Sequence, residues 1–244
     1  MDNWQERTEM LIGPEGLGRL AAAHVVVAGV GGVGAAAAEM LVRAGVGAIT
    51  IIDSDAFSLT NLNRQLPALN STIGLPKVDV MKARLLDINP GLRISTIGEY
   101  ITEESIPALL GSMVQDVDYV VDAIDTLSPK IALIQYCLGR GIPLVSSMGS
   151  GAKMDATKVR MTDISKTRMC PLAHMLRKRL HKLGIREGFL AVFSEETPMR
   201  ESTVIEESRN KKSQVGTISY LPTVFGCVCA QAAISHFVGV EENF

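Results

Sequence analysis

The chain has 244 residues, a formal net charge of −2 and a hydrophobic content of 47%. This composition excludes an intrinsically disordered chain, and the small net charge excludes nucleic-acid binding through the overall field of the protein. The four cysteines form no CxxC pair, so we expect no structural zinc. With no apolar leader in the first ten residues, we expect reduced thiols in a cytoplasmic protein.

Short β-branched runs alternate with helical periodicity through the first 150 residues. Five runs predict strands, at 24–29, 48–53, 92–97, 118–123 and 143–147, and the first of them is of the fully buried type. Three segments between them predict helices, at 35–44, 77–88 and 129–139. This alternation predicts an α/β, Rossmann-like fold, with a mostly parallel sheet flanked by helices.

After residue 151 the pattern changes to an extension of the same sheet. Strands are predicted at 158–164 and 189–194, with a basic amphipathic helix at 171–183 between them. The polar residues 198–216 lack apolar periodicity and predict a mobile loop.

The apolar stretch 218–240 near the C-terminus has the length of a membrane span. Pro222, Gln231 and His236 interrupt it, and no Lys or Arg flanks it closely. A buried helix that starts near Pro222 is the better interpretation, so we expect no membrane partner.

A glycine-rich loop follows the first predicted strand. Gly29, Gly31, Gly32 and Gly34 form a G-x-G-x-x-G pattern with one additional glycine. Glycine lets backbone N–H groups approach a nucleotide, and the following helix N-terminus attracts phosphate. Asp53 ends the next predicted strand, about twenty residues on, where a ribose hydroxyl is usually held. The loop predicts a nucleotide site, and by itself it also fits a dinucleotide-linked dehydrogenase.

Further polar residues follow the ends of the predicted strands, where a dehydrogenase does not need them. They are Asp55, Asn61, Arg64, Gln65, Lys77, Asp122 and Asp125. In an open α/β sheet these positions share the edge at which ligands bind. Each alone also fits a structural role; Asp125, for example, is placed to cap the next helix. Together, cations beside carboxylates indicate a triphosphate that is cleaved with magnesium.

These spacings resemble the adenylating fold shared by ubiquitin-activating enzymes and the bacterial ThiF and MoeB proteins. The matching positions are Arg7, the glycine loop, Asp53-x-Asp55, Asn61-x-Asn63-Arg64-Gln65, Pro76-Lys77, Asn89-Pro90 and Asp122-x-x-Asp125. With segments 145–151, 170–173 and 192–196, the chain resembles most the tRNA threonylcarbamoyladenosine dehydratases of that superfamily. We therefore expect one ThiF-type adenylating domain, 1–244, with a nucleotide-binding core, 1–151, and a C-terminal extension, 152–244.

The resemblance implies an ATP-dependent dehydratase. Such an enzyme adenylates the threonyl carboxylate of N6-threonylcarbamoyladenosine in tRNA and then cyclises it. The implied roles are nucleotide binding by the four glycines, Asp53, Asp55 and Asp122, phosphate binding by Asn61, Arg64, Gln65 and Lys77, and Mg²⁺ binding by Asp125. The resemblance also implies a homodimer in which Arg7 reaches the ATP of the partner.

Alternatives remain open on the sequence. The runner-up is an adenylyltransferase that activates the C-terminal carboxylate of a ubiquitin-like sulfur carrier, with Cys170 as its candidate thiol nucleophile. A third class is a non-catalytic accessory protein that binds nucleotide and assists sulfur transfer. A cysteine desulfurase or SufE-like partner is consistent with this class. The basic run Arg177–Lys182 suits either tRNA phosphates or a solvated helix face.

Overall fold

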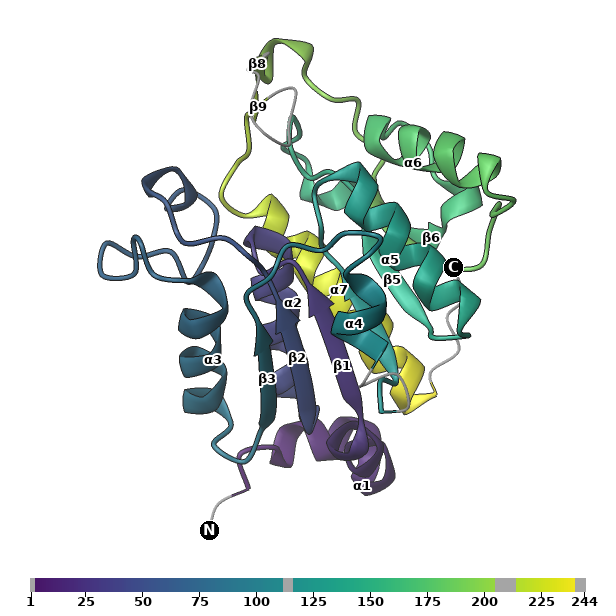
Figure 1. The fold of residues 1–244 in the computed structure, drawn as a ribbon. Helices are drawn as coiled ribbons and strands as arrows, with labels where there is room; N and C mark the ends of the chain where they lie inside the picture. The colour runs from purple at the N-terminus through teal and green to yellow at the C-terminus, as the bar shows by residue number, and fades with distance from the viewer. Residues whose placement is uncertain (1–2, 112–115, 205–213, 240–244) are drawn as a thin grey trace.

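The computed structural model describes residues 3–111, 116–204 and 214–239. A seven-stranded sheet crosses the molecule in the order β3-β2-β1-β4-β5-β7-β6 (Figure 1). Only β6 runs antiparallel to its neighbour β7 among the pairs of this sheet. The strands are β1 His24–Ala28, β2 Ala48–Ile52, β3 Arg93–Ile97, β4 Tyr119–Asp122, β5 Leu144–Ser147, β6 Val159–Asp163 and β7 Leu190–Ser194. The predicted mostly parallel sheet with a C-terminal extension is confirmed.

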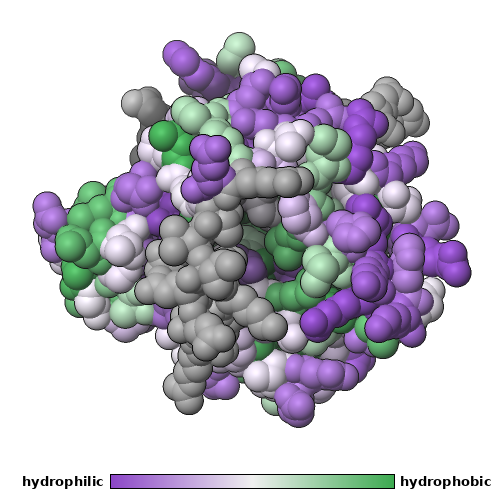
Figure 2. Space-filling model, turned by 90° about the horizontal axis from the view of Figure 1, so that it is seen from above, coloured by the Kyte–Doolittle hydropathy of each residue, from purple (hydrophilic) through white to green (hydrophobic). Residues whose placement is uncertain are grey.

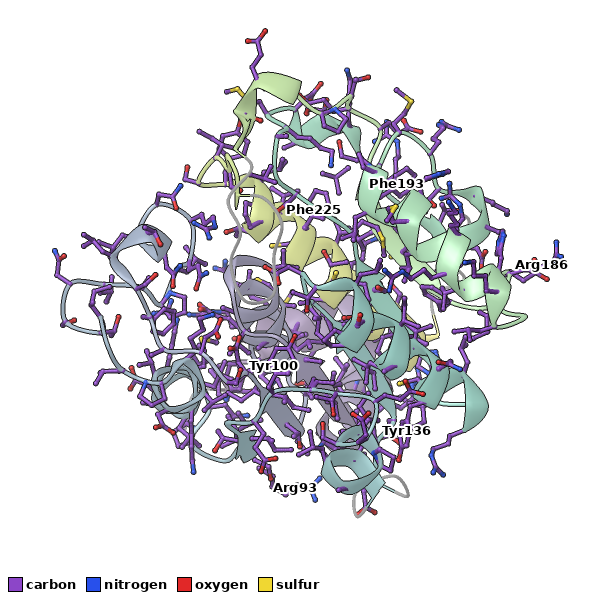
Figure 3. All side chains as sticks on the ribbon, turned by 45° about the horizontal axis from the view of Figure 1, so that its top comes forward. Arg93, Tyr100, Tyr136, Arg186, Phe193 and Phe225 are labelled. Carbon is purple, nitrogen blue, oxygen red and sulfur yellow. The ribbon has the colours of Figure 1, made fainter. Side chains whose placement is uncertain are left out.

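Helices cover both faces of the sheet. One face carries α1 Glu6–Ala22, α2 Gly32–Ala44, α3 Lys77–Ile88 and α7 Leu221–Val238. The other carries α4 Ile106–Gly111, α5 Leu127–Gly139 and α6 Pro171–Lys182. Phe225 of α7 and Phe193 of β7, labelled in Figure 3, belong to the two separate apolar clusters. Because both faces of the central strands are buried, β1 and β2 have nearly continuous apolar sequences, whereas the edge strands β3 and β6 are only partly buried.

Two helices and a small hairpin were not predicted. In α1 the backbone of Gly13 has φ 72° before Pro14, so the helix is kinked and its apolar periodicity is broken. The other unpredicted helix, α4, has only six residues. Within the loop predicted over 198–216, the hairpin of β8 Thr203–Val204 and β9 Gln214–Val215 forms, and residues 205–213 lie outside the described part.

The buried C-terminal helix is confirmed as α7. By length and composition this helix is also apolar enough to cross a membrane. Its apolar surface is used inside the protein, because Phe225 is fully buried and Gly226 packs directly on the backbone of Val33 in α2. A Cβ at Gly226 would overlap that backbone, so the close approach of the two helices requires glycine.

Candidate active site

The glycine loop lies at the carboxyl ends of β1 and β4, where the strand order reverses. Gly29 has φ 86°, and a Cβ there would lie 2.9 Å from the Ala123 carbonyl oxygen. A Cβ at Gly34 would overlap the Gly29 carbonyl. These two glycines therefore serve the close packing of β1, α2 and the loop after β4.

Gly31 serves a different purpose from its neighbours. It caps α2 with φ −74° and ψ −150°, an extended conformation that any residue adopts. A Cβ at Gly31 would meet only the Gln65 side chain, with Nε2 at 3.6 Å. Gln65 is 7% exposed, and its Oε1 has no hydrogen-bond partner among the described residues. Gly31 and Gln65 thus form a polar cradle at a helix N-terminus, which fits a phosphate group.

We expect Gly31→Ala to lower ATP affinity about tenfold or more while leaving the folding stability nearly unchanged. The added methyl group meets Gln65 at an ordinary contact distance, but it occupies the surface that a pyrophosphate approaches. Calorimetric titration with ATP and a urea unfolding curve measure the two effects. Unchanged ATP affinity in the folded variant would show that no phosphate lies against Gly31.

Asp53 links the glycine loop to the start of α3. Its Oδ2 accepts a hydrogen bond from the Val30 N–H at 2.8 Å, and its Oδ1 accepts one from the Asp55 N–H at 2.9 Å. Lys77 Nζ lies 2.9 Å from Asp55 Oδ2 and 3.7 Å from Asp53 Oδ1. Burial raises the pKa of Asp53, and the charge of Lys77 opposes that shift. The loop, a carboxylate pair and a buried cation are thereby fixed together.

The segment after β2 brings the other predicted phosphate ligands to the same edge. Asn61 Oδ1 accepts a hydrogen bond from the Ser58 N–H at 3.1 Å, which caps the short 3₁₀ helix η1 Leu59–Asn61. Arg64 Nη1 donates to the Thr60 carbonyl and to Asn63 Oδ1, both at 2.8 Å. The Arg64 carbonyl lies 3.1 Å from a Cβ built on Gly32, so this segment packs on the glycine loop.

Asp122 and Asp125, three residues apart, lie in different surroundings. Asp125 is exposed in the loop between β4 and α5. Asp122 is fully buried, and its Oδ2 lies 2.6 Å from Nζ of Lys130, which is also fully buried. We therefore assign Asp122 to a buried ion pair instead of to the nucleotide. Sequence reasoning missed Lys130, although a single charge within the apolar helix 127–139 was a usable signal.

Arg7 is not brought to the glycine loop within one chain. It lies in the first turn of α1, and the neighbouring Gln5 packs against Gly45 at the C-terminal end of α2. α1 lies at the amino ends of the strands, opposite the edge that carries the glycine loop (Figure 1). Any contact of Arg7 with a nucleotide would have to be made to a second copy of the chain.

The donor set at this edge is compatible with Mg²⁺. Among the described residues, no group of three His, Cys, Asp or Glu side chains forms a metal cluster. Mg²⁺ does not need one, since it commonly binds one or two carboxylates together with substrate phosphates and water. Asp125, exposed in the loop that packs on Gly29, is a carboxylate of that kind.

The model of the ThiF family matches residues 5–244. A tRNA threonylcarbamoyladenosine dehydratase of Bacillus subtilis is 44% identical over 230 residues, which cover 91% of this chain and 89% of that protein. The structure of the Escherichia coli tRNA N6-threonylcarbamoyladenosine dehydratase in complex with ATP superposes with a TM-score of 0.88 at 36% identity, covering 98% of this chain and 96% of that one. The same enzyme in complex with AMP gives a TM-score of 0.86 at 37% identity, with the same coverage. A molybdopterin-synthase adenylyltransferase of Haemophilus influenzae is 34% identical over 146 residues, 60% of this chain and 51% of that protein. The chain therefore belongs to the ThiF family, and its predicted resemblance to the dehydratases of that family is confirmed.

Proposed function

We propose that this protein is an ATP-dependent dehydratase that adenylates the threonyl carboxylate of N6-threonylcarbamoyladenosine in tRNA and closes it into a ring. The observation that carries the proposal is the buried Lys77 beside Asp53 and the glycine loop, at the ligand-binding edge of the sheet. The same fold holds ATP in the E. coli dehydratase.

The chemistry balances without an enzyme nucleophile. A carboxylate oxygen attacks the α-phosphorus of ATP, the bond to the β-phosphate breaks, and pyrophosphate leaves. The carbamoyl group of the same substrate then attacks the acyl carbon, and AMP leaves with one carboxylate oxygen as the ring closes. Because both reacting groups belong to one bound molecule, positioning supplies most of the acceleration.

The side chains divide this work. Gly31 and Gln65 hold the phosphate chain, and Lys77 with Arg64 stabilises the charge that develops on pyrophosphate. Asp53, beside the glycine loop, binds the ribose hydroxyls, while Asn61 and Asp55 hold the neighbouring segments in place. When bound, Mg²⁺ would neutralise phosphate charge, and Asp125 is the residue that would hold it.

ATP–pyrophosphate exchange tests the proposed substrate directly. We expect exchange to be stimulated by tRNA that carries threonylcarbamoyladenosine and not by the same tRNA transcribed without the modification. Stimulation by a small carrier protein ending in Gly-Gly instead would overturn the proposal in favour of sulfur-carrier activation. ATP binding without exchange under either condition would favour the accessory class.

Three of the four thiols give the sulfur-carrier alternative no support, and the fourth, Cys227, is exposed on α7. Cys170 is 4% exposed at the start of α6, within the apolar cluster on that face of the sheet. Burial raises the pKa of Cys137 and Cys229 to about 12, so both remain protonated thiols at neutral pH. A thioester intermediate would need an accessible thiolate, which these three residues do not offer.

Helix α6 is the surface that we propose for tRNA phosphates. Its exposed side includes Lys178, Arg179 and Lys182, and Arg186 extends outward just beyond it (Figure 3). Arg177 is only partly exposed, because its guanidinium donates to the Thr167 carbonyl at 2.9 Å. The basic patch is therefore narrower than the run of charges in the sequence.

Changing Lys178 and Lys182 to Glu together is expected to weaken tRNA binding and to reduce the salt slope by about one for each lost phosphate contact. ATP binding should be unaffected, because both residues lie on α6 and away from the glycine loop. Filter binding across a salt series measures the slope. The pair Lys82→Glu and Arg93→Glu provides a charge-matched control on exposed residues of α3 and β3, away from α6, and an equal effect of both pairs would argue against a specific surface.

We also propose a homodimer. The segment between β2 and α3 projects five exposed leucines, and Figure 2 shows a hydrophobic patch at this side of the molecule. They are Leu59, Leu62, Leu66, Leu69 and Leu75. An apolar patch of this kind marks a protein contact. A role for Arg7 at the nucleotide would require that α1 of the second copy reach this site, because one chain cannot bring its own Arg7 there.

Subunit complementation tests the trans role of Arg7. We expect Arg7→Ala and Lys77→Met to be inactive separately. Random mixing should restore about a quarter of wild-type activity, since half of the dimers carry one intact composite site out of two. The activity of dissociated and reassociated mixtures measures this fraction. Mixing that restores no activity would exclude a trans role for Arg7.

A further inference from the structure

A fully buried polar network lies directly beneath the loop that carries Asp125. Lys130 Nζ donates to Asp122 Oδ2 at 2.6 Å, to Ser146 Oγ at 3.0 Å and to the Ser147 carbonyl at 3.0 Å. Ser146 Oγ donates to Asp122 Oδ2 at 2.6 Å. Asp122, Lys130 and Ser146 are each 0% exposed, so the network joins β4, α5 and β5 without contact to solvent.

The network also holds the backbone that leads to Asp125. The second oxygen of Asp122, Oδ1, accepts a hydrogen bond from the Ile124 N–H at 3.1 Å. On the opposite side, the Ala123 N–H donates to the Ala28 carbonyl at 2.8 Å, and the Ala123 carbonyl packs on Gly29. The two residues before Asp125 are thus fixed between the buried network and the glycine loop.

Stability alone is a weak explanation for this arrangement. A buried ion pair is often no more stabilising than apolar residues of the same size, because both charges lose their hydration. The Lys130 cation also lies in the first turn of α5, where it opposes the helix dipole. The network instead fixes the relative positions of β4, α5 and β5 beneath the site, because its hydrogen bonds are directional.

We propose that Asp122, Lys130 and Ser146 are positioning residues that set where Asp125 stands relative to the phosphates of the bound nucleotide. This inference deepens the proposed function and rests on its assignment of Asp125 to Mg²⁺. In metalloproteins, removal of a residue that does not touch the metal but orients one of its ligands commonly lowers metal affinity by about 10–100-fold.

The test compares variants that keep the site charge balanced. Asp122→Asn combined with Lys130→Met removes the ion pair without leaving a lone buried charge, and Ser146→Ala removes one hydroxyl while keeping the pair. Glu39→Gln is the matched control, because Glu39 is a buried carboxylate paired with Arg43 and Arg84 between α2 and α3. Calorimetry gives the ATP affinity with Mg²⁺ and with a chelator, and pyrophosphate exchange gives the Mg²⁺ dependence.

We expect the double variant to reduce the Mg²⁺-dependent gain in ATP affinity by about tenfold or more, with ATP affinity in chelator unchanged. Ser146→Ala should change the gain in the same direction by less, and Glu39→Gln should not change it. A wild-type gain in both network variants would overturn the proposal and leave the network a purely structural role. If the double variant does not fold, the Mg²⁺-dependent gain in ATP affinity of Ser146→Ala tests the proposal by itself.

Asp125→Asn separates this proposal from the proposed function. Loss of the Mg²⁺ gain in Asp125→Asn, with full gain in the network variants, overturns only the positioning role. An unchanged gain in Asp125→Asn removes the metal assignment, and the positioning proposal fails with it. Failure of the dehydratase function would appear elsewhere, as a wild-type protein that binds ATP with Mg²⁺ but never dehydrates the tRNA.

Discussion

Replacing Lys77 with Met is expected to lower kcat for adenylation by about 10²–10³-fold, the usual effect of removing one preorganised charge from a developing oxyanion. Lys77 is 6% exposed and lies between two carboxylates at the start of α3. A cation at a helix N-terminus opposes the helix dipole, so its position is explained better by an anionic ligand than by helix stability. Single-turnover formation of AMP measures the effect.

Lys82→Met is the control for the Lys77 variant, because Lys82 is an exposed residue of the same helix. The loss of Lys77 also leaves Asp53 buried without a cation. Since burial already raises the pKa of Asp53, its protonation favours folding, and the stability lost in Lys77→Met should grow as pH rises through that pKa. An unchanged kcat in the folded variant would show that Lys77 has only a structural role, as the counter-charge of Asp53.

Replacing Lys130 alone with Met is expected to destabilise the protein by about 3–5 kcal/mol, because the Asp122 carboxylate is then buried without its counter-charge. Asp122→Asn in the same chain should recover most of that loss, since no charge remains to be paired. Urea unfolding curves of the two single variants and the double variant give the coupling free energy.

The double-variant cycle has a clear contrary result. If the two single losses simply add in the double variant, the pair contributes no interaction beyond the two separate side chains. The Glu39–Arg84 pair gives a comparison at 8% and 41% side-chain exposure, where solvent screening should leave a much smaller coupling. Similar coupling at both pairs would contradict the low-dielectric surroundings inferred for Lys130.

The sheet could be predicted from sequence because its central strands are apolar on both faces, as in Val25–Ala28, and glycine or proline marks several strand ends. Helix α1 could not be predicted, because Gly13 and Pro14 interrupt the apolar periodicity of its sequence. The motif also could not show which glycines meet a ligand. Gly29 and Gly34 are required by backbone packing, whereas a Cβ at Gly31 would meet only the Gln65 side chain, at an ordinary contact distance.

The two aspartates at the carboxyl end of β4 show the same limit of sequence-based prediction more clearly. Asp122 ends β4 and Asp125 follows it in the same motif, and nothing in their spacing says which of them faces the ligand. The answer depends on Lys130 and Ser146, which reach Asp122 from α5 and β5. Such long-range partners are set by tertiary packing and leave only a faint signal in the sequence, a single Lys in an apolar helix.

The most direct test of the dehydratase activity is the mass of the modified nucleoside after tRNA carrying linear threonylcarbamoyladenosine is incubated with the protein, ATP and Mg²⁺. We expect loss of the mass of one water molecule, dependent on ATP and absent with Arg64→Ala or Asp125→Ala. An unchanged nucleoside mass with the folded, ATP-binding wild-type protein would contradict it.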